Sequence, residues 1–179
     1  SIRIERERRD RHFTEFQTQE LTPEEMQRET GDLAQSAKNY RRSAFVFVHG
    51  FRVTFENAMF RAAQMACDMN FDGPVFAYSW PARGVVKSYA TDMDSAKLAA
   101  PYLDEFLMRI AENPAIDRIH LVSHSMGNAV LAELMGSAGT RVAMREEATL
   151  DQLVLAAPDI DREVFRGVAD AMTKAAQRV

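Results

Sequence analysis

The stretch that decides the fold is Arg118-Ile119-His120-Leu121-Val122-Ser123-His124-Ser125-Met126-Gly127-Asn128. Residues 118–122 alternate in a way that predicts a strand, and residues 126–136 have the spacing of a short helix. The small residues between them allow the strand and helix backbones to pass close together. A sharp strand–turn–helix with Ser125 at its apex is therefore expected.

The same order of elements repeats on both sides of this stretch. Strands are predicted over 44–48, 74–78, 118–122 and 152–157, and helices over 55–69, 91–111, 126–136 and 161–176. Pro101 interrupts the second helix, so a kink or a new helix start is expected there. Four strand–helix pairs predict right-handed crossovers and a mainly parallel sheet with helices on both faces. In such α/β folds the functional sites lie at the carboxyl ends of the strands.

Length and composition exclude several classes of protein. A chain of 179 residues with 46% hydrophobic residues suits one compact core. The net charge of -4 argues against a nucleic-acid partner, and no apolar run approaches the roughly 20 residues of a membrane span. No cluster of ligands suggests a metal site, and no glycine-rich nucleotide loop is present.

Residues 1–40 differ in composition from the core expected over 41–179. They are rich in Arg, Glu and Gln, and Ile2, Ile4, Phe13 and Phe16 suit one or two edge strands. Thr22 followed by proline predicts a helix start. We expect this segment to extend or wrap the core. Its charged start has no signal peptide, so the bacterial cytoplasm and export after signal removal both stay open.

The pentapeptide Ser123-His124-Ser125-Met126-Gly127 matches the G-x-S-x-G nucleophile elbow, with serine in place of the first glycine. An elbow between a strand and a helix holds its central serine above the sheet at a helix N-terminus. Ser125 is accordingly the predicted nucleophile. The backbone N–H of Met126 is predicted to be one donor of an oxyanion hole.

A second donor is expected from the loop after the strand at 44–48. Gly50 lets the backbone approach the substrate, and the N–H of Phe51 is the predicted donor. His49 has two interpretations, a brace for this loop or a general base, and the first is favoured. Together with His124 and Trp80, it is expected to line the site.

Several separate motifs occur in a recognisable order. They are Phe47-Val48-His49-Gly50-Phe51, Phe55-Glu56-Asn57-Ala58, Ala63-Gln64, Tyr78-Ser79-Trp80-Pro81, Tyr89 with Asp92, His124-Ser125-Met126-Gly127-Asn128 and Leu155-Ala156-Ala157-Pro158-Asp159-Ile160-Asp161. Over about residues 44–166 the chain resembles the bacterial DUF900 group of α/β-hydrolases, whose function is unknown. The resemblance implies an α/β-hydrolase fold, a Ser-His-acid triad and no metal or organic cofactor.

The base and the acid are the open part of this triad. All four histidines (His12, His49, His120 and His124) precede Ser125, whereas in α/β-hydrolases the catalytic histidine follows the serine. One interpretation is that the chain lacks C-terminal strands carrying the histidine. A natural pseudoenzyme and a histidine from another subunit are the alternatives. Asp159 is a candidate acid, and Asp161 suits a helix N-cap.

The sequence therefore predicts a serine hydrolase acting on a small-molecule carboxylic ester through an acyl-enzyme on Ser125, with an incomplete triad. The alternative is a non-catalytic binding or assembly module with the same fold. An exposed last strand would favour self-association of the chain through the sheet edge.

Overall fold

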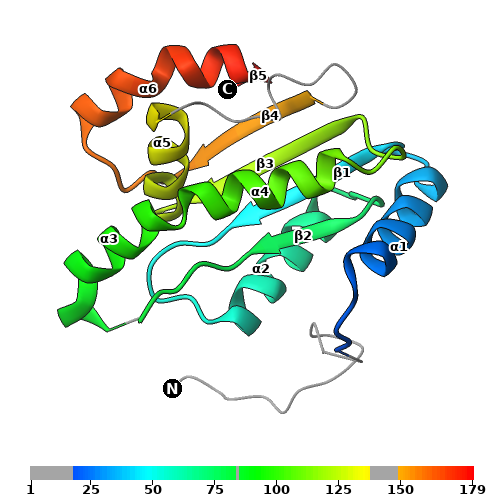
Figure 1. Ribbon diagram of the computed structural model, residues 1–179, viewed down its shortest axis with the longest axis horizontal. Helices are drawn as coiled ribbons and strands as arrows, with labels where there is room; N and C mark the ends of the chain where they lie inside the picture. Colours follow the sequence, from blue (N-terminus) through cyan, green and yellow to red (C-terminus); the bar gives the residue numbers. More distant parts are fainter. Residues whose placement is uncertain (1–17, 84, 138–148) are drawn as a thin grey trace.

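The computed structural model of the chain describes residues 18–83, 85–137 and 149–179 (Figure 1). A parallel sheet with the strand order β2-β1-β3-β4-β5 forms its centre. The strands are β1 (Ser43–Val48), β2 (Val75–Tyr78), β3 (Arg118–His124), β4 (Thr149–Ala156) and β5 (Ala176–Arg178). The helices are α1 (Pro23–Ser36), α2 (Phe55–Asp68), α3 (Tyr89–Leu98), α4 (Ala100–Ala111), α5 (Gly127–Ser137) and α6 (Arg162–Ala175), with a 3-10 turn η1 (Val86–Ser88). The predicted α/β fold is confirmed.

The two faces of the sheet bury different sets of side chains. In β1, Ala44, Val46 and Val48 join the larger core with α3, α4, α5 and α6, whereas Phe45 and Phe47 pack toward α2 on the other face. All six residues of β1 are buried because helices cover both faces of this strand. Figure 1 shows the four later helices on one side of the sheet and α2 on the other.

The single helix predicted over 91–111 is two helices. The helix α3 begins at Tyr89 and ends at Leu98, and α4 begins at Ala100 with Pro101 in its first turn. Proline has no N–H to donate to the preceding turn, but the first turn of a helix requires none. Pro101 therefore marks a helix start rather than a kink.

The strand β5 was not predicted. The helix expected to reach residue 176 ends at Ala175, and Ala176 and Arg178 pair with Leu150 and Gln152 of β4. A strand of three residues is too short to leave a periodic pattern in the sequence. Its position beside β4 places it at the edge of the sheet.

The N-terminal region contributes one helix to the described structure. The predicted start at Thr22 is confirmed, since its hydroxyl accepts from the N–H of Glu25 while the Glu25 carboxylate accepts from the N–H of Thr22. Ala34 of α1 belongs to the larger core. The edge strands predicted around Ile2, Ile4, Phe13 and Phe16 lie outside the described residues. None of the described helices is long and apolar enough to cross a membrane.

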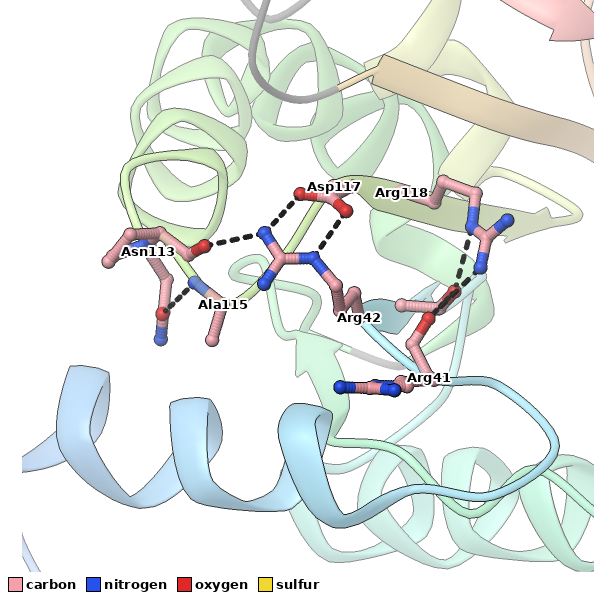
Figure 2. A network of polar contacts seen from close by, with 8 residues as sticks. Arg41, Arg42, Asn113, Ala115, Asp117 and Arg118 are labelled. Atoms are coloured by element: carbon pink, nitrogen blue, oxygen red, sulfur yellow. Dashed lines mark hydrogen bonds and ion pairs between the residues drawn. The ribbon is translucent and has the colours of Figure 1, made fainter.

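A polar network joins the amino ends of β1 and β3 (Figure 2). The Arg42 guanidinium binds the Asp117 carboxylate and the Pro114 carbonyl, and Arg118 donates to the backbone of Arg41 and to the Ser43 hydroxyl. The guanidinium holds the pKa of Asp117 below its usual range. This network sets the register of the two strands whose opposite, carboxyl ends carry Ser125 and Gly50.

Candidate active site

Ser125 occupies the turn between β3 and α5, where the sequence places the elbow. Its φ of 52° lies in the left-handed region, which side chains other than glycine rarely adopt. The turn is held from both sides: the Ser125 N–H donates to the Ala156 carbonyl at 3.0 Å, and the Asp159 N–H donates to the Ser125 carbonyl at 3.2 Å. The last residue of β4 and the segment after it therefore stabilise the strained backbone of the serine.

Two glycines permit the close approach that this turn requires. A Cβ at Gly127 would lie 2.6 Å from the His49 carbonyl oxygen and 2.9 Å from that of Val48. A Cβ at Gly50 would lie 2.8 Å from the Ser125 Cβ. Since both contacts are shorter than real Cβ atoms tolerate, only glycine lets the loop after β1 pass directly beside the serine.

Asn128 is a structural residue of the site to which the sequence analysis assigned no role. Its side chain is fully buried, and its amide donates to the carbonyls of Ser123, Ser125 and Ala156. Buried amides of this kind stabilise irregular backbone that has no ladder partners. Its position could have been noticed in the sequence, because the motif His124-Ser125-Met126-Gly127-Asn128 ends at this asparagine.

Two backbone N–H groups beside Ser125 lack an acceptor. Within the described residues, neither Met126 nor Phe51 donates its N–H to another group. Met126 immediately precedes the first turn of α5, and Phe51 follows Gly50 in the adjoining loop. Unpaired amides next to a helix N-terminus are what the binding of an oxyanion requires.

His49 is fully buried and hydrogen-bonded through both ring nitrogens. Its Nδ1 donates to the Gly50 carbonyl at 2.9 Å, and its Nε2 accepts from the Trp80 N–H and the Ser79 hydroxyl, both at 3.2 Å. Burial lowers its pKa, which favours the neutral ring. In this geometry neither nitrogen is free to accept a proton from Ser125.

Trp80 stabilises the loop after β1 through two contacts with His49. Its ring stacks on His49 with centroids 5.3 Å apart, and its indole N–H donates to the His49 carbonyl at 2.7 Å. Only 2% of Trp80 is exposed, so its ring offers almost no surface to a substrate. Trp80 was expected to line the site, and the structure places it against His49 in the loop after β1.

The other two described histidines differ in position. His120 lies on the α2 face of the sheet, with its Nδ1 3.4 Å from an Asp151 oxygen and its ring against Tyr40 and Phe71. His124 is exposed and borders Gly50: its Nδ1 lies 3.2 Å from the point that a Gly50 Cβ would occupy. No hydrogen bond to the Ser125 hydroxyl occurs among the described residues.

Asp159 is held near the serine turn by Tyr89 of α3. The Tyr89 hydroxyl donates to its carboxylate at 2.9 Å, which raises the pKa of the tyrosine, and the Tyr89 ring packs edge-on against Phe51. Asp161 points elsewhere and caps α6 by accepting from the N–H groups of Glu163 and Val164. Of the two acids, only Asp159 contacts the residues around Ser125.

The segment that precedes Tyr89 is held by a buried acid. The Asp92 side chain is fully buried and accepts from the Arg83 N–H at 3.1 Å and the Ser88 hydroxyl at 3.2 Å. These contacts tie the segment before α3 to its first turn. The pairing of Tyr89 with Asp92 in the family motif thus corresponds to one local structure.

A cavity of about 610 Å³ opens beside this site, between α3, α5 and α6. Tyr89 and Asp159 form part of its wall, but Ser125 does not. The cavity therefore adjoins the candidate nucleophile through the residues that contact the serine turn. Among the described residues, no group of His, Cys, Asp and Glu side chains is arranged to hold a metal ion.

Comparison with known proteins identifies a family. The family model described as "Alpha/beta hydrolase of unknown function (DUF900)" matches residues 25–179, which is most of the chain. No curated protein and no solved structure matches.

Proposed function

Because the chain belongs to the DUF900 family of α/β-hydrolases, we propose that it hydrolyses a carboxylic ester with Ser125 as the nucleophile. The observation that carries this proposal is the left-handed backbone of Ser125 between β3 and α5. A serine in this strained conformation has a cost of about 1–3 kcal/mol, which folds retain where the conformation has a use. A nucleophile elbow is such a use.

The reaction has two balanced steps. The Ser125 oxygen attacks the ester carbonyl carbon while its proton passes to a base, and the alcohol leaves with that proton as the C–O bond breaks. A water then attacks the acyl-enzyme, the carboxylic acid is released, and the Ser125 hydroxyl regains a proton. In both steps the N–H groups of Met126 and Phe51 would stabilise the negative carbonyl oxygen.

Asp159 has a supporting role in this proposal. Its N–H stabilises the Ser125 turn, and its carboxylate is engaged by Tyr89. The base is assigned by exclusion among the described histidines. His49 and His120 are committed to other contacts, so His124 is the one whose substitution tests the assignment.

The test is intact-mass analysis after incubation with a fluorophosphonate probe. We expect one adduct on the wild-type chain and none on Ser125→Ala. Ser123→Ala is the matched control, because it removes a buried serine hydroxyl two residues before Ser125. This substitution is expected to leave labelling unchanged. Loss of labelling in a stably folded His124→Gln chain would support His124 as the base, whereas retained labelling would exclude His124 as the base.

A second candidate is a non-catalytic assembly module with the same fold. The observation that favours it is the outer side of β4, which pairs with β5 only near Leu150 and Gln152 in the described part of the chain. Unpaired strand edges promote association of chains. Absence of labelling, together with concentration-dependent oligomers in light scattering, would favour this function over ester hydrolysis.

A further inference from the structure

The cavity between α3, α5 and α6 has the form of a groove along α5. The α5 residues in its wall are Ala129, Ala132, Glu133, Gly136 and Ser137, which recur three and four positions apart and so share one helix face. At 1.5 Å per residue this face is roughly 12 Å long. Its residues are mostly small, which leaves room above the helix.

One end of the groove is lined by residues that contact the Ser125 turn, although Ser125 itself does not line it. Ala129 lies one helical turn after Ser125, and the wall at this end includes Tyr89 and Asp159. The Asp159 N–H donates to the Ser125 carbonyl, and the Tyr89 ring contacts Phe51 in the loop after β1. A molecule bonded to the Ser125 oxygen would therefore have this groove as a direct continuation.

The walls of the groove are largely apolar. Met93 of α3, Val164 and Val168 of α6, and Ile160 contribute apolar side chains to it. Val164 is half exposed although it is a large apolar side chain. The wall also contains four charged side chains: Lys97, Glu133 and Asp161 are exposed, and the Asp159 carboxylate accepts from the Tyr89 hydroxyl. An aliphatic chain suits such walls, because each buried methylene strengthens binding roughly fourfold.

We propose that this groove binds the acyl chain of a medium-chain ester, an inference that rests on Ser125 being the nucleophile of the proposed function. The acyl chain, unlike the alcohol, stays bonded to Ser125 between the two steps. A groove that starts at the serine turn can therefore hold it throughout the reaction.

The test uses decanoate and a leucine placed in the groove. Gly167 shares the helix face of Val164, lines the cavity, and has no atom within 4 Å of the position of an added Cβ. Gly167→Leu should therefore fill the groove without displacing its neighbours. Asp170→Leu is the matched control, because it places the same side chain on the same helix at an exposed position outside the cavity wall.

We expect calorimetric binding of decanoate but not acetate to the wild-type chain. Gly167→Leu should weaken decanoate binding about 10-fold or more, with Asp170→Leu unchanged and circular dichroism confirming that both variants fold. Equal decanoate affinity in the two variants, or no binding to the wild type, would overturn the assignment. So would binding of decanol in preference to decanoate, which would assign the groove to the alcohol.

Failure of this inference can be told apart from failure of the proposed function. Ser125→Ala should keep decanoate binding while it loses fluorophosphonate labelling. Labelling without decanoate binding refutes the groove alone. Decanoate binding without labelling refutes Ser125 as an active nucleophile and leaves an apolar-ligand site, but not an acyl subsite.

Discussion

At the scale of single residues, the site depends on which backbones can approach one another. Gly127 lies against two carbonyl oxygens of the loop after β1, and Gly50 lies against Ser125 itself. The nucleophile-elbow motif requires a small residue at position 127 because its strand and helix pack closely together. The structure adds that a Cβ at position 127 would clash with the carbonyl oxygens of Val48 and His49, which belong to the end of β1 and the loop after it.

Gly127→Ala is therefore expected to lower the free energy of unfolding by about 1–3 kcal/mol, since the rigid carbonyls of Val48 and His49 must shift to admit the methyl group. Gly167→Ala is the matched control within α6, where the methyl group meets open space and should add about 0.5–1 kcal/mol by improving helix propensity. Urea unfolding measures both. Equal stability of Gly127→Ala and the wild type would show that the contact is easily relieved.

At the scale of elements, the segment after β4 connects the serine turn with α6. Asp159 and Asp161 are two residues apart, yet one contacts Tyr89 and the other caps a helix. Their division of roles follows from the turn between β4 and α6, which presents the first side chain toward α3 and the second toward its own helix.

Asp161→Ala is expected to cost about 1 kcal/mol of stability, because two N–H groups of the first turn of α6 lose their acceptor. Asp161→Asn should keep most of this stability, since asparagine caps helices nearly as well. Thermal unfolding compares the two variants. A fluorophosphonate-labelling defect in a stably folded Asp161→Asn chain would contradict the purely structural role.

At the scale of the whole molecule, burial of two histidines links stability to pH. Burial is the main cause that lowers the pKa of both His49 and His120. For His120, Asp151 opposes this shift and Arg118 adds to it. In the unfolded chain both rings titrate at about pH 6.5. Below that pH the unfolded chain therefore binds more protons than the folded chain does.

The contribution of these two histidines to the free energy of unfolding is accordingly expected to be complete above about pH 6.5. It should decrease as the pH drops toward their lowered pKa values. Urea unfolding at about pH 7.5 and about pH 5.5 measures this decrease. His120→Gln should reduce this decrease. An identical decrease in His120→Gln would exclude His120 as a cause.

Local pattern was enough to predict much of this protein. Apolar runs predicted four of the strands, helical spacing predicted the crossover helices, the small residues around Ser125 predicted the turn between β3 and α5, and Thr22 predicted the start of α1. These features depend on neighbours within a few positions in the chain. The pattern did not predict β5, which exists only through its pairing with β4.

The sequence by itself determined the order of the strands and helices and the place of Ser125 between β3 and α5, because backbone preference and side-chain periodicity are local. Only the tertiary structure decided that the His49 ring is hydrogen-bonded within its own loop and that Trp80 is buried against it. It also decided that Tyr89 contacts Asp159, 70 residues later in the chain. The groove along α5 likewise needs walls from three helices. Contacts between distant segments follow from how the helices pack on the sheet, which no short stretch of the sequence encodes.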